Sequence, residues 1–584
     1  MSRARHILII PALVLQAILV VHTITCKNVT VDETQHILAG LLYLRRGTTD
    51  FYTVNPPVGR AWIAAPLLSA NLELPTTEES DESHRLLNWG KAFQDANADE
   101  FSSIVKRARL SQVVLCLLGT WLITKWASSL FGPSAGIIGM CLWLTCQSIL
   151  AWSTIGTTDL AATVSALAMV TIWRSFLLRP GKWRVVAVAV VTGLAIATKF
   201  SLLVLLPVMI ALAIAQPRCR LSHAAIGTVL LFLVLNAVYL FHGTGRQLGS
   251  YEFLSKSLTG DQFGRPANRF RGTVIEGLPL PLPSDFVTGL DLQKSHNDYA
   301  FYNYFCGEWK HGGWWYYYLA AALVKIPLGT WLLGIAALVL ICFRHFRASL
   351  LDEALIWLPP LAILVLVSSQ TGINGHFRYA LPALPFVFIG ISRVGRLFEF
   401  GSKGPGRGRG YVRMAAAAGI AGCLIWNAAE TLRYHPHHLS YFNQIAGGPD
   451  NGWKWLAESN IDWGQDLLLL KEWLDQHPEA TASMQLAYYG GVPPHLLGVK
   501  GAAIQYQYGP QPGWYAVSVN ALVGMAFSSR YPEGGFIHYP LGAFRYFEHF
   551  TPMAKAGYSI FIYHITLEEA NEVRRNLGLS PLPP

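Results

Sequence analysis

The chain has 584 residues, of which 52% are hydrophobic and only 14% are charged, and its mean hydropathy is +0.33. Ordinary soluble domains carry about 25% charged residues, so this composition excludes a disordered chain and argues against a purely soluble enzyme. Lys and Arg outnumber Asp and Glu by 45 to 35, a net charge of +10. The eight cysteines include no Cys-x-x-Cys pair, so the sequence predicts neither a disulfide framework nor a zinc site.

Apolar runs of membrane-spanning length recur from residue 7 to residue 430 and predict a polytopic α-helical membrane protein. The first run, 7–24, follows a short basic start and has no small-x-small cleavage site, which favours a retained helix over a cleaved signal peptide. Lys199 separates two short runs that form either two spans or one broken element. We expect about eleven spans: 7–24, 110–131, 134–152, 159–178, 184–199, 201–216, 223–242, 316–342, 354–369, 379–396 and 412–430.

The positions of Lys and Arg predict the orientation of these spans. With the N-terminus in the cytoplasm, the short loops on the inner side are basic, as in Arg179, Lys182 and Arg184. The excess positive charge is therefore read as a signal of membrane topology, and no nucleic-acid partner is expected. The same alternation places two long loops, 26–109 and 243–315, on the outer face.

Residues 431–584 contain no spanning run and follow the last helix to the outer side. Strand-like segments are expected at 484–489, 514–519 and 558–563, and helical segments at 465–476 and 567–576. We therefore expect two domains, a transmembrane domain over 1–430 and an extracytoplasmic α/β or α+β domain over 431–584. The second domain is long enough to bury a core of its own.

The few charges that remain near the outer ends of the spans are the main functional signal. Ionisable groups in or beside membrane helices are costly and often mark a site. A carboxylate can act as a base toward a hydroxyl, and Arg or Lys can bind a phosphate. Each also has a plain structural interpretation, as a solvated residue, a helix cap or a snorkelling side chain. The residues are Asp32, Glu33, Asp159, Lys199, Lys325, His376 and Arg378.

A proline-rich segment in the first long loop reads Asn55-Pro56-Pro57-Val58-Gly59-Arg60. The two prolines favour an extended approach followed by the start of a helix. The apolar stretch over 58–70, with one Arg and one Trp, is typical of a helix that lies in the membrane interface. Such a helix either grips a lipid substrate or serves only as scaffold.

At these residues the sequence resembles the GT-C superfamily of membrane glycosyltransferases. The resemblance is closest to the branch with the protein O-mannosyltransferases and the aminoarabinose transferase of lipid A. Asp32-Glu33 matches the family's acidic pair after the first helix, and Asp159 matches a second acid before the fourth. The segment over 55–60 matches His-Pro-Pro-x-Gly-Lys, with Asn in place of His and Arg in place of Lys. Segments 441–443 and 459–467 resemble bacterial relatives. The C-terminal tail, residues 431–584, does not resemble the eukaryotic β-trefoil domain.

The resemblance implies an inverting transfer of a sugar from a polyprenyl-phosphate donor, at the outer face of a bacterial inner membrane, to a protein or glycolipid hydroxyl. It makes Asp32 the base, with Glu33 and Asp159 orienting it or the acceptor. It implies no obligatory metal, although Asp462 and Asp466 leave a metal alternative open. The residues it assigns to the donor phosphate are Lys199, Arg378, Arg60 and His376.

Two alternatives remain from the sequence. The acceptor is either protein or an envelope glycolipid such as lipid A. A transporter or flippase would use similar outer charges, but it commonly contains internal repeats, and the segment over 32–62 has no second copy. In the tail, a polar cluster either binds sugar or begins a helix. Its members are Asn460, Asp462, Trp463 and Gln465.

Overall fold

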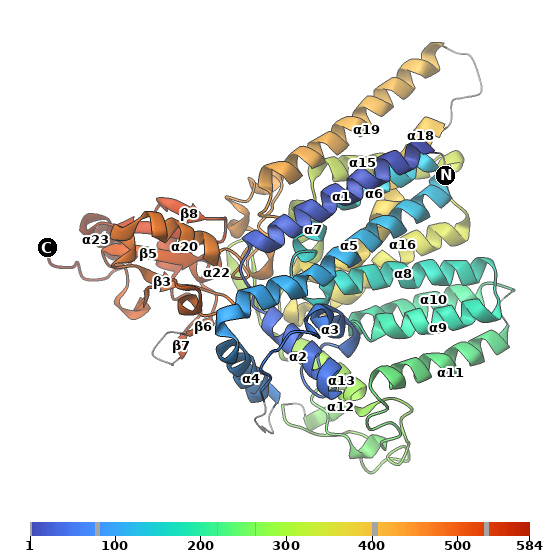
Figure 1. Ribbon diagram of the computed structural model, residues 1–584, viewed down its shortest axis with the longest axis horizontal. Coiled ribbons are helices and arrows are strands. Elements are labelled where there is room, and N and C mark those ends of the chain that lie inside the picture. The colour runs from blue at the N-terminus through green and yellow to red at the C-terminus, as the bar shows by residue number, and fades with distance from the viewer. Residues whose placement is uncertain (1–2, 76–81, 219, 263, 400–406, 531–535) are drawn as a thin grey trace.

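The computed structural model describes residues 3–75, 82–218, 220–262, 264–399, 407–530 and 536–584. Long helices lie side by side over most of the chain, and a small sheet domain lies beyond one end of them (Figure 1). The first helices are α1 (Arg3–Cys26), α2 (Glu33–Arg46), α3 (Pro57–Ala64), α4 (Glu82–Ala96), α5 (Phe101–Phe131), α6 (Pro133–Leu144), α7 (Gln147–Trp152), α8 (Thr158–Leu178), α9 (Lys182–Ile196), α10 (Leu205–Ile214), α11 (Leu221–Val238), α12 (Lys256–Thr259) and α13 (Ser284–Tyr299).

The remaining helices include the last long one and the short helices of the C-terminal part. They are α14 (Tyr317–Lys325), α15 (Leu328–Ile341), α16 (Leu350–Ser369), α17 (Leu384–Ile391), α18 (Arg396–Glu399), α19 (Arg407–Tyr434), α20 (Leu467–Gln476), α21 (Pro478–Thr481), α22 (Val519–Leu522) and α23 (Leu567–Asn576). The 3₁₀ helices used below are η3 (Phe200–Val204), η8 (Phe377–Ala383) and η12 (Glu458–Asn460).

The chain is a polytopic helical membrane protein, but the expected count of eleven spans is not confirmed. Among the described residues, seven helices are long and apolar enough to cross a membrane, or eight if one bent pair counts as a span. Shorter helices occupy the expected spans 134–152, 184–199 and 201–216. Each of these helices has fewer than 18 residues, so its length does not by itself confirm the expected span.

The expected single span 316–342 is instead two helices, α14 and α15, bent by 114°. The break falls at Ile326 and Pro327, where proline removes a backbone donor and disfavours a helical residue before it. Lys199 lies at a similar break, between α9 and η3, in extended conformation. Both interruptions therefore place a lysine beside irregular backbone at a helix end.

The first outer loop is folded tightly around α2 and α3. A side chain at Gly40 would bring its Cβ within 2.1 Å of the carbonyl oxygen of Arg60, so glycine is what lets the two helices touch. The predicted interfacial helix is thus mostly packed within the protein, and Pro57, Gly59 and Arg60 are buried. Trp62, 40% exposed, remains on its outer side. The close packing gives the segment that follows Asp32 a fixed position.

The C-terminal part contains a mixed sheet with strand order β4-β3-β5-β9-β8. Strand β3 pairs in parallel with β4 and β5, whereas β9 is antiparallel to β5 and β8. The expected strands and helices of this part are present, including α20 and α23. The strands of the protein are β1 (Tyr302–Phe305), β2 (Glu308–His311), β3 (Gln485–Ala487), β4 (Ala502–Ala503), β5 (Gly513–Ser518), β6 (Phe527–Arg530), β7 (Phe536–Tyr539), β8 (Ala554–Ala556) and β9 (Ile560–Ile565).

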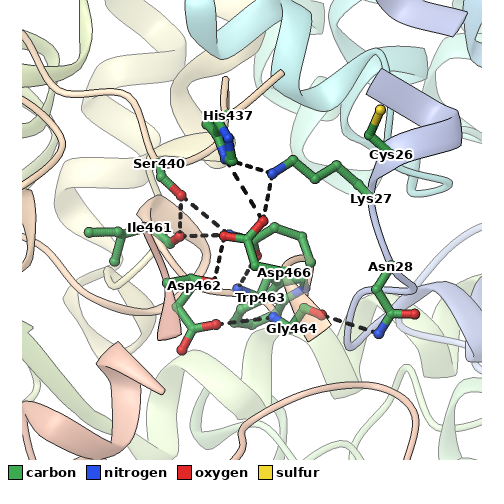
Figure 2. Close-up of polar contacts among 12 residues, drawn as sticks. Cys26, Lys27, Asn28, His437, Ser440, Ile461, Asp462, Trp463, Gly464 and Asp466 are labelled. Atoms are coloured by element: carbon green, nitrogen blue, oxygen red, sulfur yellow. Dashed lines mark hydrogen bonds and ion pairs between the residues drawn. The ribbon is translucent and has the colours of Figure 1, made fainter. Parts of the chain in front are cut away.

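A buried ion pair attaches this C-terminal part to the end of the first helix. Figure 2 shows Lys27 reaching between Asp466 and His437; its Nζ lies 2.5 Å from Oδ1 of Asp466 and 2.7 Å from Nδ1 of His437. Burial alone would raise the pKa of Asp466, but Lys27 and His437 more than offset this, and the pKa is lowered. The other carboxylate oxygen accepts from Ser559, 2.8 Å away. The contact therefore joins α1, the segment after α19, and the loop before β9.

Replacing Lys27 by Met should destabilise the folded protein by about 3–5 kcal/mol, because Asp466 would remain buried without its cation. Thermal unfolding in detergent measures the effect. Lys471→Met is the matched control, since the Lys471–Asp475 pair is exposed and worth about 0.5 kcal/mol or less. Equal unfolding temperatures for the two variants would contradict the assignment.

Candidate functional site

Two carboxylates and two cations from four separate elements meet at one end of the helices. Nη1 of Arg378 lies 2.7 Å from Oδ2 of Asp32 and 3.7 Å from Oδ2 of Asp159. The ammonium group of Lys199 forms an ion pair with the other oxygen of Asp159. The structure thus brings together Asp32, Asp159, Lys199 and Arg378, which the sequence analysis placed on the same face of the membrane.

The carboxylates of Asp32 and Asp159 both lie at the start of a helix, where neither is used as a helix cap and both can pair with the cations. Asp32 is the residue before α2, yet its side chain makes no capping hydrogen bond. Asp159 lies in the first turn of α8, and Thr157 donates to its Oδ2 at 2.9 Å. The positive end of a helix dipole favours a carboxylate at both positions. The alternative interpretation of Asp159 as a helix cap is not supported, because Thr157 occupies the capping position.

Aromatic rings surround the cations of the site. The guanidinium carbon of Arg378 lies 5.2 Å from the ring centre of Trp152, 5.1 Å from that of Trp463 and 5.5 Å from that of Tyr379. The ammonium group of Lys199 lies 5.2 Å from the centre of the Tyr379 ring. Rings of this kind attract cations and exclude water, which strengthens the ion pairs.

Glu33, predicted to act beside Asp32, faces a different set of partners. Its Oε1 accepts from Nε of Arg109 at 2.7 Å and from the amide of Gly156 at 2.6 Å. Its Oε2 accepts from Nη2 of Arg109 at 2.6 Å and from the amide and hydroxyl of Thr30. Both oxygens are therefore occupied by protein donors, and the side chain is fully buried. This bidentate pair fixes the loop between α1 and α2, and with it the position of Asp32.

Two residues expected at the donor phosphate instead contact protein groups. Arg60 is 1% exposed and donates to the carbonyl oxygens of Phe51, Tyr52 and Thr49, so it ties the loop before α3 to that helix. That loop lies ahead of the Asn55-Pro56-Pro57 segment, in which Asn55 accepts from the hydroxyl of Thr158 at 3.4 Å. The structure therefore gives Arg60 a scaffold contact, which a sequence motif cannot distinguish from a ligand contact.

His376 is the second of these residues. Its Nδ1 lies 2.8 Å from the hydroxyl of Ser459, and its Nε2 lies 3.1 Å from Oε2 of Glu458. Glu458 is buried, its backbone has a φ of +54°, and its amide donates to Asn520 at 2.6 Å. Burial raises the pKa of Glu458 to about 7, and the nearby Arg378 offsets only part of this effect. Both ring nitrogens of His376 are thus engaged by the C-terminal part.

The polar cluster of the tail mainly joins the two parts of the protein. Oδ1 of Asn460 accepts from the amide of Phe377 at 3.0 Å, and its Nδ2 donates to the carbonyl of Gly375 at 2.6 Å. Asn460 thereby fixes the start of η8, which carries Arg378. Lys325 donates to the carbonyls of Leu439 and Asn460 at 2.8 and 2.6 Å. These contacts leave no local signal in the sequence, because they join segments far apart in the chain.

Asp462 and Asp466, the residues of the metal alternative, are both engaged by protein donors. Oδ1 of Asp462 accepts from the amide of Gly464 at 3.1 Å (Figure 2). Its Oδ2 accepts from the amide of Asn520 at 3.2 Å. Burial raises the pKa of Asp462 to about 7, although these hydrogen bonds act in the opposite direction. Across the described ranges, no group of three or more His, Cys, Asp or Glu is arranged to hold a metal ion.

A mostly apolar cavity of about 430 Å³ adjoins the cluster. Lys199 and Tyr379 lie on its wall, so the cavity reaches the ion pairs directly. Lys294 on α13 contributes a second ammonium group to the lining. The rest of the wall comes from η3, α13, α14 and α16, and includes Phe200, Leu203, Val204, Leu290, Leu366, Val367 and Ile373. An elongated apolar ligand with an anionic end matches this distribution of side chains.

Three further residues of the site were not assigned from the sequence. Arg109 was placed at the edge of a span and Glu458 in the tail, and their roles depend on partners distant in sequence. His36 follows Asp32 by one helical turn and is 3% exposed. Burial lowers its pKa to about 4, and Asp32 and Asp159 only partly oppose this effect. The one signal available was the i, i+4 spacing of Asp32 and His36, which places both on one face of α2.

The fold and the site define a class of protein: a membrane protein with paired carboxylates and cations beside an apolar cavity. Residues 101–242 match the family model described as "Dolichyl-phosphate-mannose-protein mannosyltransferase". The matched stretch contains Arg109, Asp159 and Lys199, and it confirms over those residues the resemblance to the protein mannosyltransferase branch of the GT-C superfamily. The match supports the interpretation of this chain as a membrane glycosyltransferase.

Comparison with curated proteins finds no match. Among solved structures, ArnT from Cupriavidus metallidurans bound to undecaprenyl phosphate is 12% identical, with 91% of this chain and 97% of that chain covered and a TM-score of 0.47. The Archaeoglobus fulgidus oligosaccharyltransferase in complex with Zn and sulfate is 11% identical, with 90% and 73% covered and a TM-score of 0.44.

The raised pKa of Glu458 predicts a specific dependence of stability on pH. Between its ordinary value of 4.5 and about 7, the folded protein holds a proton that the unfolded chain releases, so stability falls as pH rises through this window. Glu458→Gln should remove the part of this fall that Glu458 contributes, on the order of 2–3 kcal/mol, and leave the part due to Asp462, whose pKa is also raised to about 7. Thermal unfolding at pH 5 and pH 7.5 tests it, with the exposed Glu479→Gln as control. A fall of the same size in Glu458→Gln would contradict the prediction.

Proposed function

We propose that the chain is an integral membrane glycosyltransferase that moves a sugar from a polyprenyl-phosphate donor to an acceptor hydroxyl, with inversion. The observation that carries the proposal is the Asp32–Arg378 pair at 2.7 Å, beside a cavity whose wall includes Lys199. A base, a phosphate-binding cation and an apolar compartment are what this reaction needs within one site. The site and the C-terminal part lie on the outer face of a cell membrane, as the positions of Lys and Arg indicate.

The cavity is the proposed site of the donor lipid. Its apolar walls suit the first isoprene units, and Lys199 on its wall provides positive charge for the phosphate. Lys294 also lies on the wall, where it pairs with Asp298. Arg378 adds a guanidinium, whose planar shape suits phosphate oxygens. We leave Arg60 and His376 out of this donor site: Arg60 donates to carbonyl oxygens of the loop before α3, and both ring nitrogens of His376 contact the C-terminal part.

Asp32 is the proposed catalytic base. Its side chain is 24% exposed, whereas that of Asp159 is 3% exposed and paired with Lys199, so Asp32 is the more accessible carboxylate. Asp32 takes the proton of the acceptor hydroxyl as that oxygen forms a bond to the anomeric carbon. The bond from this carbon to the phosphate oxygen breaks, and polyprenyl phosphate leaves with the electron pair. Lys199 and Arg378 stabilise the charge that develops on the leaving group.

Glu33 and Asp159 support this chemistry as positioning residues. Glu33 holds the loop before α2 through Arg109, and Asp159 orients Lys199. A monophosphate leaving group with two cations beside it needs no metal, so we propose that the reaction is metal-independent. The acceptor is the hydroxyl of a protein or of an envelope glycolipid. A transporter is the weaker candidate, because a buried carboxylate next to the phosphate site serves no step of simple lipid movement.

Asp32→Asn should lower turnover by about 10²–10⁴-fold, the usual contribution of a general base, and leave donor binding largely intact. The measurement is release of polyprenyl phosphate when purified protein is supplied with polyprenyl-phosphate sugars and an acceptor extract. Asp50→Asn serves as control, since Asp50 pairs with Arg85 in an exposed position outside the site. Unchanged release by Asp32→Asn would refute the assignment of the base. Accumulation of donor across liposomes without release would favour a transporter.

Lys199→Met should weaken binding of polyprenyl phosphate by about 10- to 100-fold, the effect of losing one charge-assisted contact. Binding is measured by titration of the detergent-solubilised protein, which does not depend on turnover. Lys310→Met, on an exposed strand, should bind as the unaltered protein does. Equal affinity in the Lys199 and Lys310 variants would place the phosphate elsewhere.

A further inference from the structure

The C-terminal part contributes backbone and side chains directly beside Asp32. The amide of Val31 donates to the carbonyl of Trp463 at 3.2 Å, and the amide of Asn28 donates to the carbonyl of Gln465 at 2.9 Å. The segment just before Asp32 is thus hydrogen-bonded to the tail like a short paired strand. Figure 2 shows Asn28 and the segment around Trp463 facing one another. Any ligand at Asp32 therefore lies near the tail as well as the membrane helices.

Trp463 presents a buried donor to this place. It is 4% exposed, its ring centre lies 5.1 Å from the guanidinium carbon of Arg378, and its ring packs at 5.2 Å against His376. Within the described part of the chain, its indole nitrogen has no hydrogen-bond partner. A buried polar group without a partner costs about 1–3 kcal/mol, which a ligand atom that accepts the hydrogen bond would recover.

His36, in α2 near the N-terminus, presents a second buried nitrogen without a partner. It lies one turn after Asp32 on α2, is 3% exposed and packs its ring at 5.1 Å against that of Tyr52. Its Nδ1 is buried and lacks a partner among the residues that the structure describes. Its low pKa, about 4 because of burial, leaves the imidazole neutral at physiological pH.

The charge of these groups separates them from the phosphate site. Lys199 and Arg378 are cations, suited to an anion, and the first lies on the wall of the cavity. His36 and Trp463 are neutral: the Trp463 ring packs against Arg378, and His36 lies one helical turn after Asp32. Neutral nitrogen groups and aromatic rings suit hydroxyl groups and the apolar face of a sugar ring.

We propose that His36 and Trp463 form a subsite that binds the hydroxyl groups of the sugar carried by the lipid phosphate. The indole N–H of Trp463 donates to one hydroxyl oxygen, and Nδ1 of His36 donates to or accepts from another. This assignment rests on the proposed function, because it assumes a lipid-linked sugar in the adjoining cavity. It makes the C-terminal part a contributor to substrate recognition, and it makes both residues determinants of sugar specificity.

The test compares binding of decaprenyl phosphate with binding of decaprenyl-phosphate hexoses, using the full chain in detergent. The unaltered protein should bind at least one sugar-bearing lipid more tightly than the bare lipid, by about 3- to 10-fold for each hydrogen bond. Trp463→Phe, which keeps a ring and removes the N–H, and His36→Leu should each reduce that preference and leave the affinity for the bare lipid unchanged. His36→Asn, which retains polar atoms near the position of Nδ1, should partly restore it.

Trp126→Phe and His495→Leu are the matched controls. Each also has a buried ring nitrogen with no partner in the described part of the chain. Trp126 lies on α5 and packs against Phe386, and His495 lies in the C-terminal part near Arg530 and Asp95. Both should retain the full preference for the sugar-bearing lipid. A preference that persists unchanged in Trp463→Phe and His36→Leu, or no preference in the unaltered protein, would overturn the subsite. Failure to bind either lipid would instead overturn the proposed function, so the two failures are distinguishable.

Discussion

Arg378 lies between two carboxylates, one from the residue before α2 and one from the first turn of α8, and the geometry of the site follows from that position. Its guanidinium contacts Asp32 and approaches Asp159, which in turn pairs with Lys199. Three aromatic rings surround it and exclude water. In such surroundings an unpaired charge is costly, so each member of the network holds the others in place.

Residues outside this network hold its members in position. Glu33 and Arg109 fix the loop before Asp32, and Asn460 fixes the first residue of η8, which carries Arg378. The Lys27–Asp466 pair holds the C-terminal part against the end of α1. The tail is therefore part of the framework of the site. This explains why a short polar segment of the tail, 458–466, has so many buried side chains.

The same arrangement divides the site by chemistry. Cations and apolar walls lie on the side of the cavity, where a lipid phosphate is expected. Neutral groups, Trp463 beside Arg378 and His36 one turn after Asp32, lie where a sugar is expected. The backbone of Glu458 has a φ of +54°, and its carboxylate lies so close to Gly375 that a Cβ there, 2.5 Å from Oε2, would displace it. Strain of this kind persists only where surrounding contacts impose it.

The sequence by itself determined the class of protein, the positions of the main helices, the strands of the tail, and four of the charged residues that meet in the site. These depend on hydropathy and on the cost of charge near a membrane, both of which are local properties. It could not separate Glu33, Arg60 and His376, whose side chains are held by protein groups, from Asp32, Lys199 and Arg378. It also expected spans at three places where the helices are short. Only tertiary structure decided these points, because whether a charge meets a protein partner or a cavity depends on segments far apart in the chain.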